Sequence, residues 1–313
     1  MTPEQPQFPL RPWNYVPEPV APKPMHALVR FLFAAILVVV ANIALPVFAF
    51  LLFVTHPLLA DTFYRWGAAA VLLLGFIIFT RLLDRWDGDA WAYIGLPRQS
   101  SAFQQMLAGF AISAVLVTLA VAAIGLMGGL KLGFNFSGRA VSHELLVVLL
   151  LIGGALLEEL AFRGYPFQRL VEAIRPLGAI VVISIFFGAV HLGNPNAGGI
   201  LGWGFFNTIL VGVLFAYAYL RTQTLWLPIG LHFGWNFFLG VVYGLPVSGL
   251  RDFSVVVRST AAGSPLLTGG AYGIEASLTG TVVLILGFLL VAWAPKPELN
   301  SETTPQRSPE PGI

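Results

Sequence analysis

The sequence predicts an all-α fold, a polytopic membrane protein with about eight transmembrane helices. Of its 313 residues, 57% are hydrophobic and only 10% are charged, whereas soluble globular chains carry about 25% charged residues. The apolar residues also gather in segments near 20 residues long, the length that crosses the hydrocarbon core of a bilayer. The formal net charge of +2 is too small to indicate nucleic-acid binding, and the absence of cysteine excludes disulfides and cysteine-ligated metal ions.

Eight apolar segments fit that length, with a Pro-rich arm before the first and a polar tail after the last. The expected spans are about 27–54, 62–82, 102–127, 144–163, 177–193, 199–220, 224–247 and 277–294. Pro46 predicts a kink in the first span, and the stretch GNPNAGG interrupts the fifth. We therefore expect a disordered arm over 1–25, one membrane domain over 26–295 and a disordered tail over 296–313.

The Lys and Arg residues predict the orientation of these spans. With eight spans, twelve of the 17 Lys and Arg residues fall on the side that carries both termini. Because short cytoplasmic loops carry an excess of Lys and Arg, both termini are expected to be cytoplasmic.

Two of the connections between the expected spans have a distinctive composition. The segment 164–175 has apolar residues at helical spacing, which fits a helix lying along the cytoplasmic interface or an ordinary helix–helix connection. The segment 248–276 is long and rich in Gly and Ser, which favours an extracytoplasmic loop. No internal repeat is visible, so inverted-repeat transporter architectures gain no support.

The stretch EELAFR at 158–163 places three charges at the end of an apolar span. Each ionisable residue inside a span costs on the order of 2.5–3.5 kcal/mol, so such residues persist where they pair, face a cavity or work. Glu159 and Arg163 are four residues apart with the acid first, the favourable order for a helical ion pair. Glu158 points about 100° away and stays available for chemistry. The alternative is a cytoplasmic helix end whose charges reach water.

The stretch FGAVH at 187–191 places Phe187 and His191 four apart on one helical face. A single His at the end of a helix is more often structural than catalytic.

The stretch HFGWN at 232–236 places His232 and Asn236 four apart, well inside an apolar segment. Gly230 and Gly234 flank the His in a small-xxx-small pattern that permits close helix packing. Hydrogen bonding between helices is the simpler reading of this pair.

Together the three stretches supply two acids, two imidazoles and one amide on three separate helices. A Glu can act as general base, a His can share the proton, and a His–Asn pair can stabilise an oxyanion. The same set could hold a metal ion, such as zinc, through Glu158, His191 and His232. Asn236 is a poor zinc ligand, which slightly favours metal-independent water activation by Glu158.

These motifs give the sequence a specific resemblance. EExxxR, FxxxH and HxxxN, in that order on separate transmembrane helices, resemble the CAAX-protease and bacteriocin-processing (CPBP) family of intramembrane proteases, which includes type II CAAX prenyl endopeptidases. The resemblance covers roughly 85–295 and is densest over 155–240, and GSPLLTGGAYGIEASL at 263–278 also looks like bacterial members.

The resemblance implies roles for seven residues. Glu158 would activate water with His191 as its partner, and His232 and Asn236 would stabilise the oxyanion. Glu159 and Arg163 would orient and charge-balance the site, with Phe187 as the first residue of its motif. The substrate would be a peptide or membrane protein, with or without a lipid group, and the partners would be membrane lipids, with no nucleic acid.

One geometric difficulty accompanies this hypothesis. At 1.5 Å per residue, Glu158 lies roughly 10 Å and His232 roughly 12 Å from the cytoplasmic face, but His191 lies roughly 21 Å away. A fifth helix that is tilted or starts below the interface would bring His191 to the others, with GNPNAGG as non-helical backbone beside a watery cavity.

The expected activity is therefore hydrolysis of peptide bonds at or within the membrane. Two other functions fit the same residues. One is a non-enzymatic binding or immunity partner with the same fold, and the other is a proton-coupled transporter, since buried Glu and His residues also build proton relays.

Overall fold

The computed structural model describes residues 29, 31–32, 94–97, 99–134, 141–251, 253 and 257–294. The expected span over 62–82, most of the span over 27–54, the N-terminal arm and the C-terminal tail lie outside these residues.

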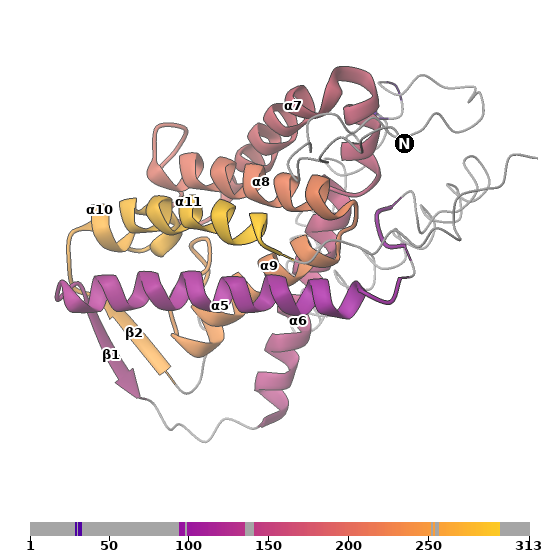
Figure 1. The fold of residues 1–313 in the computed structure, drawn as a ribbon. Coiled ribbons are helices and arrows are strands. Elements are labelled where there is room, and N and C mark those ends of the chain that lie inside the picture. The colour runs from indigo at the N-terminus through magenta and orange to yellow at the C-terminus, as the bar shows by residue number, and fades with distance from the viewer. Residues whose placement is uncertain are drawn as a thin grey trace, which may run out of the picture.

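Helices dominate the part of the chain that the structure describes (Figure 1). Each of the six remaining expected spans coincides with a helix. These helices are α5 (Ala102–Leu126), α6 (Val141–Phe162), α7 (Tyr165–Val190), α8 (Trp203–Thr222), α9 (Trp226–Asn236) and α11 (Leu278–Ala292).

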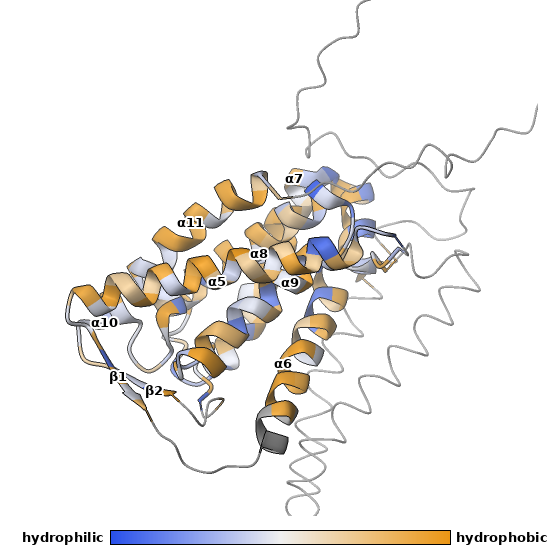
Figure 2. Cartoon of the chain, turned by 60° about the horizontal axis from the view of Figure 1, so that its bottom comes forward, coloured by the Kyte–Doolittle hydropathy of each residue, from blue (hydrophilic) through white to orange (hydrophobic). Residues whose placement is uncertain are grey.

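Among the described residues, three stretches are long and apolar enough to cross a membrane. They are Ala102–Leu126, Val147–Gly193, which runs through α6 and α7, and Trp203–Thr222. Figure 2 shows that hydrophobic residues, in orange, run along most of α5, α6 and α11. These stretches indicate an integral membrane protein. The count of eight spans is not confirmed, because Trp226–Val242 and Leu278–Ala292 are shorter apolar helices and two expected spans are not described.

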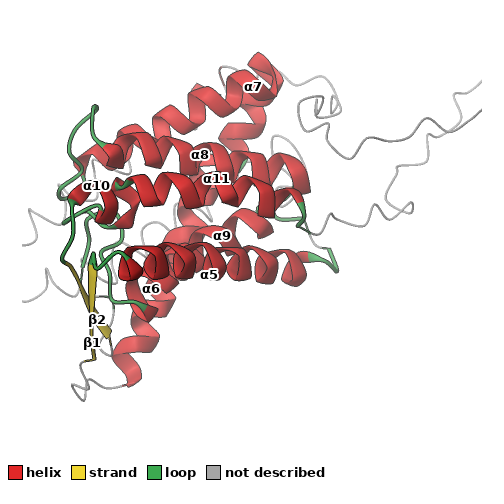
Figure 3. Cartoon of the chain, turned by 60° about the vertical axis from the view of Figure 1, so that its left-hand side comes forward, coloured by secondary structure: helices red, strands yellow, loops and turns green. Residues whose placement is uncertain are grey.

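The expectation of a purely α-helical fold needs one correction. Strand β1 (Leu130–Phe134) pairs antiparallel with β2 (Val257–Ala261), with Leu130 opposite Ala261 and Phe134 opposite Val257. This two-stranded sheet lies at one end of the helices (Figure 3). In LKLGF, apolar residues alternate with Lys131 and Gly133, which is the period of a strand. A search for segments near 20 residues long overlooks so short a pattern.

Helix α7 has two parts that meet at a kink. It begins at Tyr165, and Arg175 adopts φ 72° within it, directly before Pro176. The second part therefore begins where the fifth span was expected to start, near residue 177. Proline removes a backbone donor and disfavours helical geometry in the residue before it, which explains the bend. The segment 164–175 is thus the first part of α7, and Phe167, Leu170 and others of its apolar side chains are buried.

Helix α9 packs closely against α5 through glycine. An added Cβ at Gly230 would lie 2.1 Å from the Met106 carbonyl oxygen, and one at Gly109 would lie 2.4 Å from the Leu227 carbonyl oxygen. Ser113 on α5 also donates a hydrogen bond of 2.7 Å to the Leu231 carbonyl. The close packing predicted from Gly230 and Gly234 is confirmed, and it fixes the position of the helix that carries His232.

The remaining elements are short. They are the 3-10 turn η3 (His191–Gly193), the π-helical turn η4 (Phe237–Val242), the helix α10 (Pro265–Thr268) and the 3-10 turn η5 (Ile274–Ala276). The segment 248–276 is therefore no simple loop, since it contains β2, α10 and η5.

Candidate active site

A fully buried ion pair forms the base of the site. Nη1 of Arg163 lies 3.1 Å from Oε1 of Glu159, one helical turn earlier, and both side chains have 0% exposure. Nη2 of Arg163 donates to the Gly212 carbonyl on α8 at 3.4 Å. The predicted pairing of Glu159 with Arg163 is confirmed. Because buried charges are tolerated only when paired and hydrogen-bonded, this contact explains how the end of α6 keeps two charges inside the protein.

Glu159 also orients His232. Nδ1 of His232 lies 2.8 Å from Oε1 of Glu159. A carboxylate only accepts hydrogen bonds, so Nδ1 carries the hydrogen and Nε2 is the ring nitrogen left to act on other groups. Nε2 lies 3.8 Å from Oε2 of Glu158.

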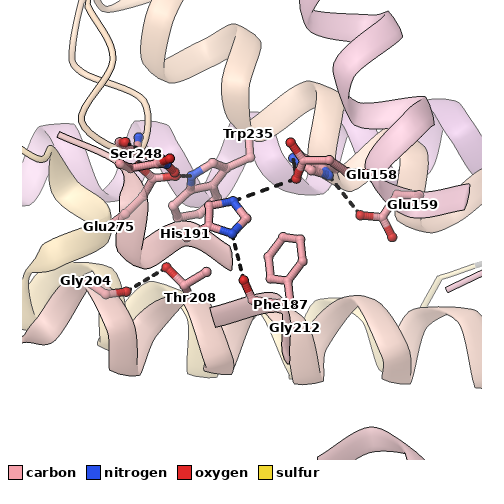
Figure 4. A network of polar contacts seen from close by, with 12 residues as sticks. Glu158, Glu159, Phe187, His191, Gly204, Thr208, Gly212, Trp235, Ser248 and Glu275 are labelled. Carbon is pink, nitrogen blue, oxygen red and sulfur yellow. Dashed lines mark hydrogen bonds and ion pairs between the residues drawn. The ribbon is translucent and has the colours of Figure 1, made fainter. Parts of the chain in front are cut away.

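His191 is oriented in a similar way. Its Nδ1 lies 2.7 Å from the carbonyl oxygen of Phe187, one turn earlier on α7. Since the carbonyl accepts, Nδ1 again carries the hydrogen. Nε2 of His191 lies 3.8 Å from the same Oε2 of Glu158 (Figure 4). The spacing of Phe187 and His191 therefore fixes one tautomer.

The aromatic ring of Phe187 makes a second contact, with Arg163. The guanidinium carbon of Arg163 lies 4.2 Å from the centre of the Phe187 ring, and the Phe215 ring lies 5.4 Å away. Aromatic faces attract a cation and shield it from solvent. Phe187 thus contributes its carbonyl to His191 and its ring to the buried Arg163.

Glu158 differs from its neighbour Glu159 in exposure and in partners. Its side chain is 41% exposed, yet its Oε2 atom is buried and accepts no hydrogen bond from the protein. Buried acceptors are nearly always satisfied by protein or by ordered water. An unsatisfied carboxylate oxygen between two imidazole Nε2 atoms is where a water molecule or a substrate group would be bound.

These groups open into a cavity of about 500 Å³. Glu158, His191, His232 and Asn236 all line it. Much of its remaining wall is apolar and includes Leu150, Leu151, Leu157, Phe162, Val190, Val211, Phe215, Val247 and Phe253. An apolar cavity with a few convergent polar groups is the usual form of a substrate site.

The structure also corrects the estimate that separated His191 from Glu158 in depth. That estimate treated the helices as parallel, whereas α6 is inclined to α5, α8 and α11 (Figures 1 and 3). His191 lies where α7 ends and η3 begins, beside Glu158, and GNPNAGG continues from there as mainly non-helical backbone. Residue counts along parallel axes therefore misjudged the relative levels of the two side chains.

The other side of the cavity carries three residues that the motifs did not indicate. Oε1 of Glu275 accepts hydrogen bonds from Nε1 of Trp235 and from Oγ of Ser248, each at 3.1 Å. Oε2 accepts one from the Ser248 backbone N–H. Figure 4 shows Glu275 and Glu158 on opposite sides of His191 and Trp235. We refer to Trp235, Ser248 and Glu275 as the clamp.

Burial raises the pKa of the Glu275 carboxyl to about 7, against the lowering effect of its hydrogen bonds from Ser248 and Trp235. In the sequence, the feature that could have indicated Glu275 is that it is an acidic residue within GIEASL, directly before an apolar helix. The sequence indicates only a likeness of that stretch to bacterial members of the family and assigns no role to Glu275.

Glu158, His191 and His232 are the residues that the sequence offers as ligands of a metal ion. No group of three His, Cys, Asp or Glu side chains in the described ranges is arranged to hold a metal ion. Glu158, His191 and His232 approach one another, but the two distances of 3.8 Å from Oε2 of Glu158 exceed the roughly 3.3 Å that separates zinc ligands bound tetrahedrally at about 2 Å. We therefore derive no step through a metal ion.

Comparison with known proteins points to membrane peptidases. Residues 141–238 match the family model described as type II CAAX prenyl endopeptidase Rce1-like, and this range includes all three motifs. Over 103 residues the chain is 31% identical to the Bacillus subtilis (strain 168) protein named "Putative membrane peptidase YdiL". That alignment covers 33% of this chain and 39% of the relative. No solved structure matches the chain significantly.

The resemblance drawn from the three motifs is thereby confirmed. The matched family and relative support a CAAX-protease-like membrane peptidase. Because the alignment spans well under half of the relative's length, the activity and substrate of the whole protein are matters for proposal.

Proposed function

We propose that this protein is an intramembrane endopeptidase that hydrolyses peptide bonds with water activated by Glu158 and His191. The observation that carries the proposal is the buried, unsatisfied Oε2 of Glu158, 3.8 Å from Nε2 of both His191 and His232. A carboxylate that lacks a donor and lies beside two oriented imidazoles, at the wall of an apolar cavity, suits the binding and deprotonation of a water molecule.

The reaction begins with water bound beside Glu158. Glu158 accepts a proton as the water oxygen attacks the carbonyl carbon of the scissile peptide bond. His191, held by the Phe187 carbonyl, orients the water through Nε2. A tetrahedral intermediate forms with a negative charge on the former carbonyl oxygen.

His232 and Asn236 stabilise that oxyanion. The two residues lie one turn apart on α9 and both line the cavity. When protonated, His232 donates from Nε2 while its Nδ1 stays bonded to Glu159, and Asn236 donates from its amide. Collapse of the intermediate breaks the C–N bond, and protonated Glu158 returns its proton to the leaving amine. Removing one such donor typically lowers kcat about 10²–10³-fold.

The substrate is proposed to be a peptide segment that reaches the membrane. The apolar cavity wall suits apolar side chains or a lipid group, and the matched family model is described as a type II CAAX prenyl endopeptidase. A farnesylated CAAX peptide and its unprenylated form are therefore the first defined probes.

The test compares newly formed peptide termini across the membrane proteome of host cells that express wild type or Glu158→Gln at equal levels. We expect termini that appear only with wild type. Glu172→Gln serves as the matched control, because Glu172 pairs with Arg169 on α7 and does not line the cavity. It should give the wild-type set. Identical sets from wild type and Glu158→Gln would overturn the proposal and favour a binding partner.

The same preparation tests the proposal that no resident metal ion takes part. EDTA should leave cleavage by the purified wild-type protein unchanged. Loss of cleavage with EDTA and its recovery with added zinc would refute metal-independent water activation while leaving the peptidase assignment intact.

A further inference from the structure

Two residues of the clamp, Ser248 and Glu275, lie outside the three motifs, and the third, Trp235, is an undefined position of HxxxN on α9. Glu275 binds Trp235 on α9 through its side-chain N–H and binds Ser248 through both its backbone N–H and its hydroxyl. The three partners are all uncharged donors. Glu275 is only 8% exposed, so its hydrogen bonds are made largely out of contact with solvent.

The backbone behind Glu275 is held rigidly. The side-chain amide of Asn207 on α8 donates to the carbonyl oxygens of Glu275 and Ser277, at 2.9 and 2.8 Å. Thr281 donates to the same Asn207 side chain at 2.7 Å. Ser277 caps α11 by accepting from the Gly280 N–H at 2.9 Å. The carboxylate of Glu275 therefore projects toward α9 from a fixed base.

Helix α9 is anchored on three sides, and Glu275 provides the third. Its Gly230 and Gly234 pack against α5. His232 is bonded to Glu159 on α6. Trp235 is bonded to Glu275, and Asn236 follows directly, at the point where the α-helix changes to the π-helical turn η4. Such π-helical turns are rare and often lie at functional sites, and Glu275 anchors α9 one residue before Asn236.

The clamp also reaches the segment that follows His191. The carbonyl oxygen of Ser248 accepts a hydrogen bond of 3.1 Å from the side-chain amide of Asn194. The backbone N–H of Asn194 donates in turn to the carbonyl of His191 at 3.1 Å. Ser248 thus connects Glu275, through Asn194, to the segment that carries His191.

We propose that Glu275 is a positioning residue of the proposed peptidase site, which sets Asn236 through Trp235 and holds the 247–250 segment against the cavity through Ser248. The inference rests on the proposed function, because its kinetic test measures the rate of peptide cleavage. A displacement of about 1 Å in a catalytic group is enough to cost about 10²-fold in rate.

The hydrogen-bond geometry explains why glutamine is a poor replacement for Glu275. Its two oxygens accept all three hydrogen bonds. A glutamine offers one acceptor oxygen, and its NH₂ group would face a donor. A buried carboxylate is costly, so simple filling of this space would favour an apolar side chain.

The kinetic test is a double-mutant cycle on Glu275→Gln and Trp235→Phe, which keeps an aromatic ring but removes the donor. The substrate is a fluorogenic peptide that spans a bond cleaved by wild type. Each single variant should lower kcat by about 10-fold or more with KM changed by less than about 3-fold. The double variant should be no slower than the slower single variant, because both break one contact. Glu172→Gln should match wild type.

Three kinetic outcomes would overturn the inference. They are wild-type kcat in Glu275→Gln, multiplicative losses in the double variant, and a change confined to KM, which would instead make Glu275 a substrate-binding group. If wild type cleaves and Glu158→Gln does not, these outcomes refute the clamp alone. If neither cleaves, the proposed function fails.

A labelling experiment tests the clamp without activity. The chain has no cysteine, so a single Val247→Cys substitution reports on the 247–250 segment, where Val247 is 5% exposed. Adding Glu275→Gln or Ser248→Ala should speed maleimide labelling several-fold, while adding Trp235→Phe should not. Equal labelling rates in all backgrounds would refute the anchoring of this segment, whatever the protein cleaves.

Discussion

The two sides of the cavity keep a buried carboxylate by different means. On one side, Glu159 shares its Oε1 with the Arg163 guanidinium and with His232. On the other, Glu275 is held by uncharged donors from Trp235 and Ser248. A cation compensates charge directly, whereas neutral donors compensate it in part. The first arrangement should therefore be costly to break, and the second should respond to pH.

The largest expected effect comes from removing the cation. Arg163→Met leaves Glu159 buried without its main partner, so we expect a loss of roughly 3–5 kcal/mol in the free energy of unfolding. The measurement is unfolding of the purified protein in detergent micelles by titration with SDS. Arg258→Met, at an exposed position on β2, is the matched control and should unfold as wild type does.

A double substitution sharpens this result. Glu159→Gln combined with Arg163→Met removes both charges, and it should recover part of the lost stability because no uncompensated charge remains. Full stability in Arg163→Met alone would show that Glu159 is not held by the guanidinium, and the contrast between the two sides would collapse.

The next effect should appear at Glu275 as a dependence of stability on pH. Its pKa of about 7 in the folded protein lies above the unfolded value of 4.5, so the folded state binds the proton more tightly. The Glu275 contribution to stability should thus be greatest below about pH 4.5, fall as pH rises, and level off above about pH 7. Linkage sets the total change at no more than about 3 kcal/mol.

Glu275→Gln provides the comparison, measured as apparent Tm in detergent from pH 4.5 to 8. It cannot titrate, so the fall in Tm across this range should be smaller than in wild type. Parallel curves for the two proteins would mean that Glu275 does not titrate in this window. Glu172→Gln is again the control: its Tm should fall across this range by as much as that of wild type does, whatever its absolute Tm.

The sequence predicted the proposed reactive side of this cavity, which carries Glu159 and Arg163, better than it predicted the clamp, for a physical reason. Glu159 and Arg163 interact within one helix turn, so their spacing reveals the contact. The bond between Trp235 and Glu275 joins residues 40 positions apart, and no local period records it. Similarly, the length of the apolar segments predicts α5, α6 and α8. The pairing of β1 with β2 and the inclination of α6 depend on tertiary packing, which these segments do not record.

The smallest of the three expected effects comes from substituting Asn236, which lies between the clamp and the side of the cavity that carries His232. It directly follows Trp235 of the clamp and lies one turn from His232. Asn236→Ala removes a proposed oxyanion donor, and we expect kcat to fall about 10²-fold, or about 2.7 kcal/mol, with little change in stability. The measurement is cleavage of the fluorogenic peptide, with SDS unfolding run in parallel.

Combining Asn236→Ala with Glu275→Gln then decides how the two sides are connected. If Glu275 acts by placing the Asn236 amide, its loss should matter much less once that amide is gone, so the pair should fall short of the product of the single effects. A full multiplicative loss would mean that Glu275 influences the reaction by a route other than Asn236, such as His232 or the 247–250 segment. That result would keep Asn236 as an oxyanion donor but separate it from the clamp. The kinetic coupling between these two variants thus measures whether the pH-responsive carboxylate controls the reactive side of the cavity.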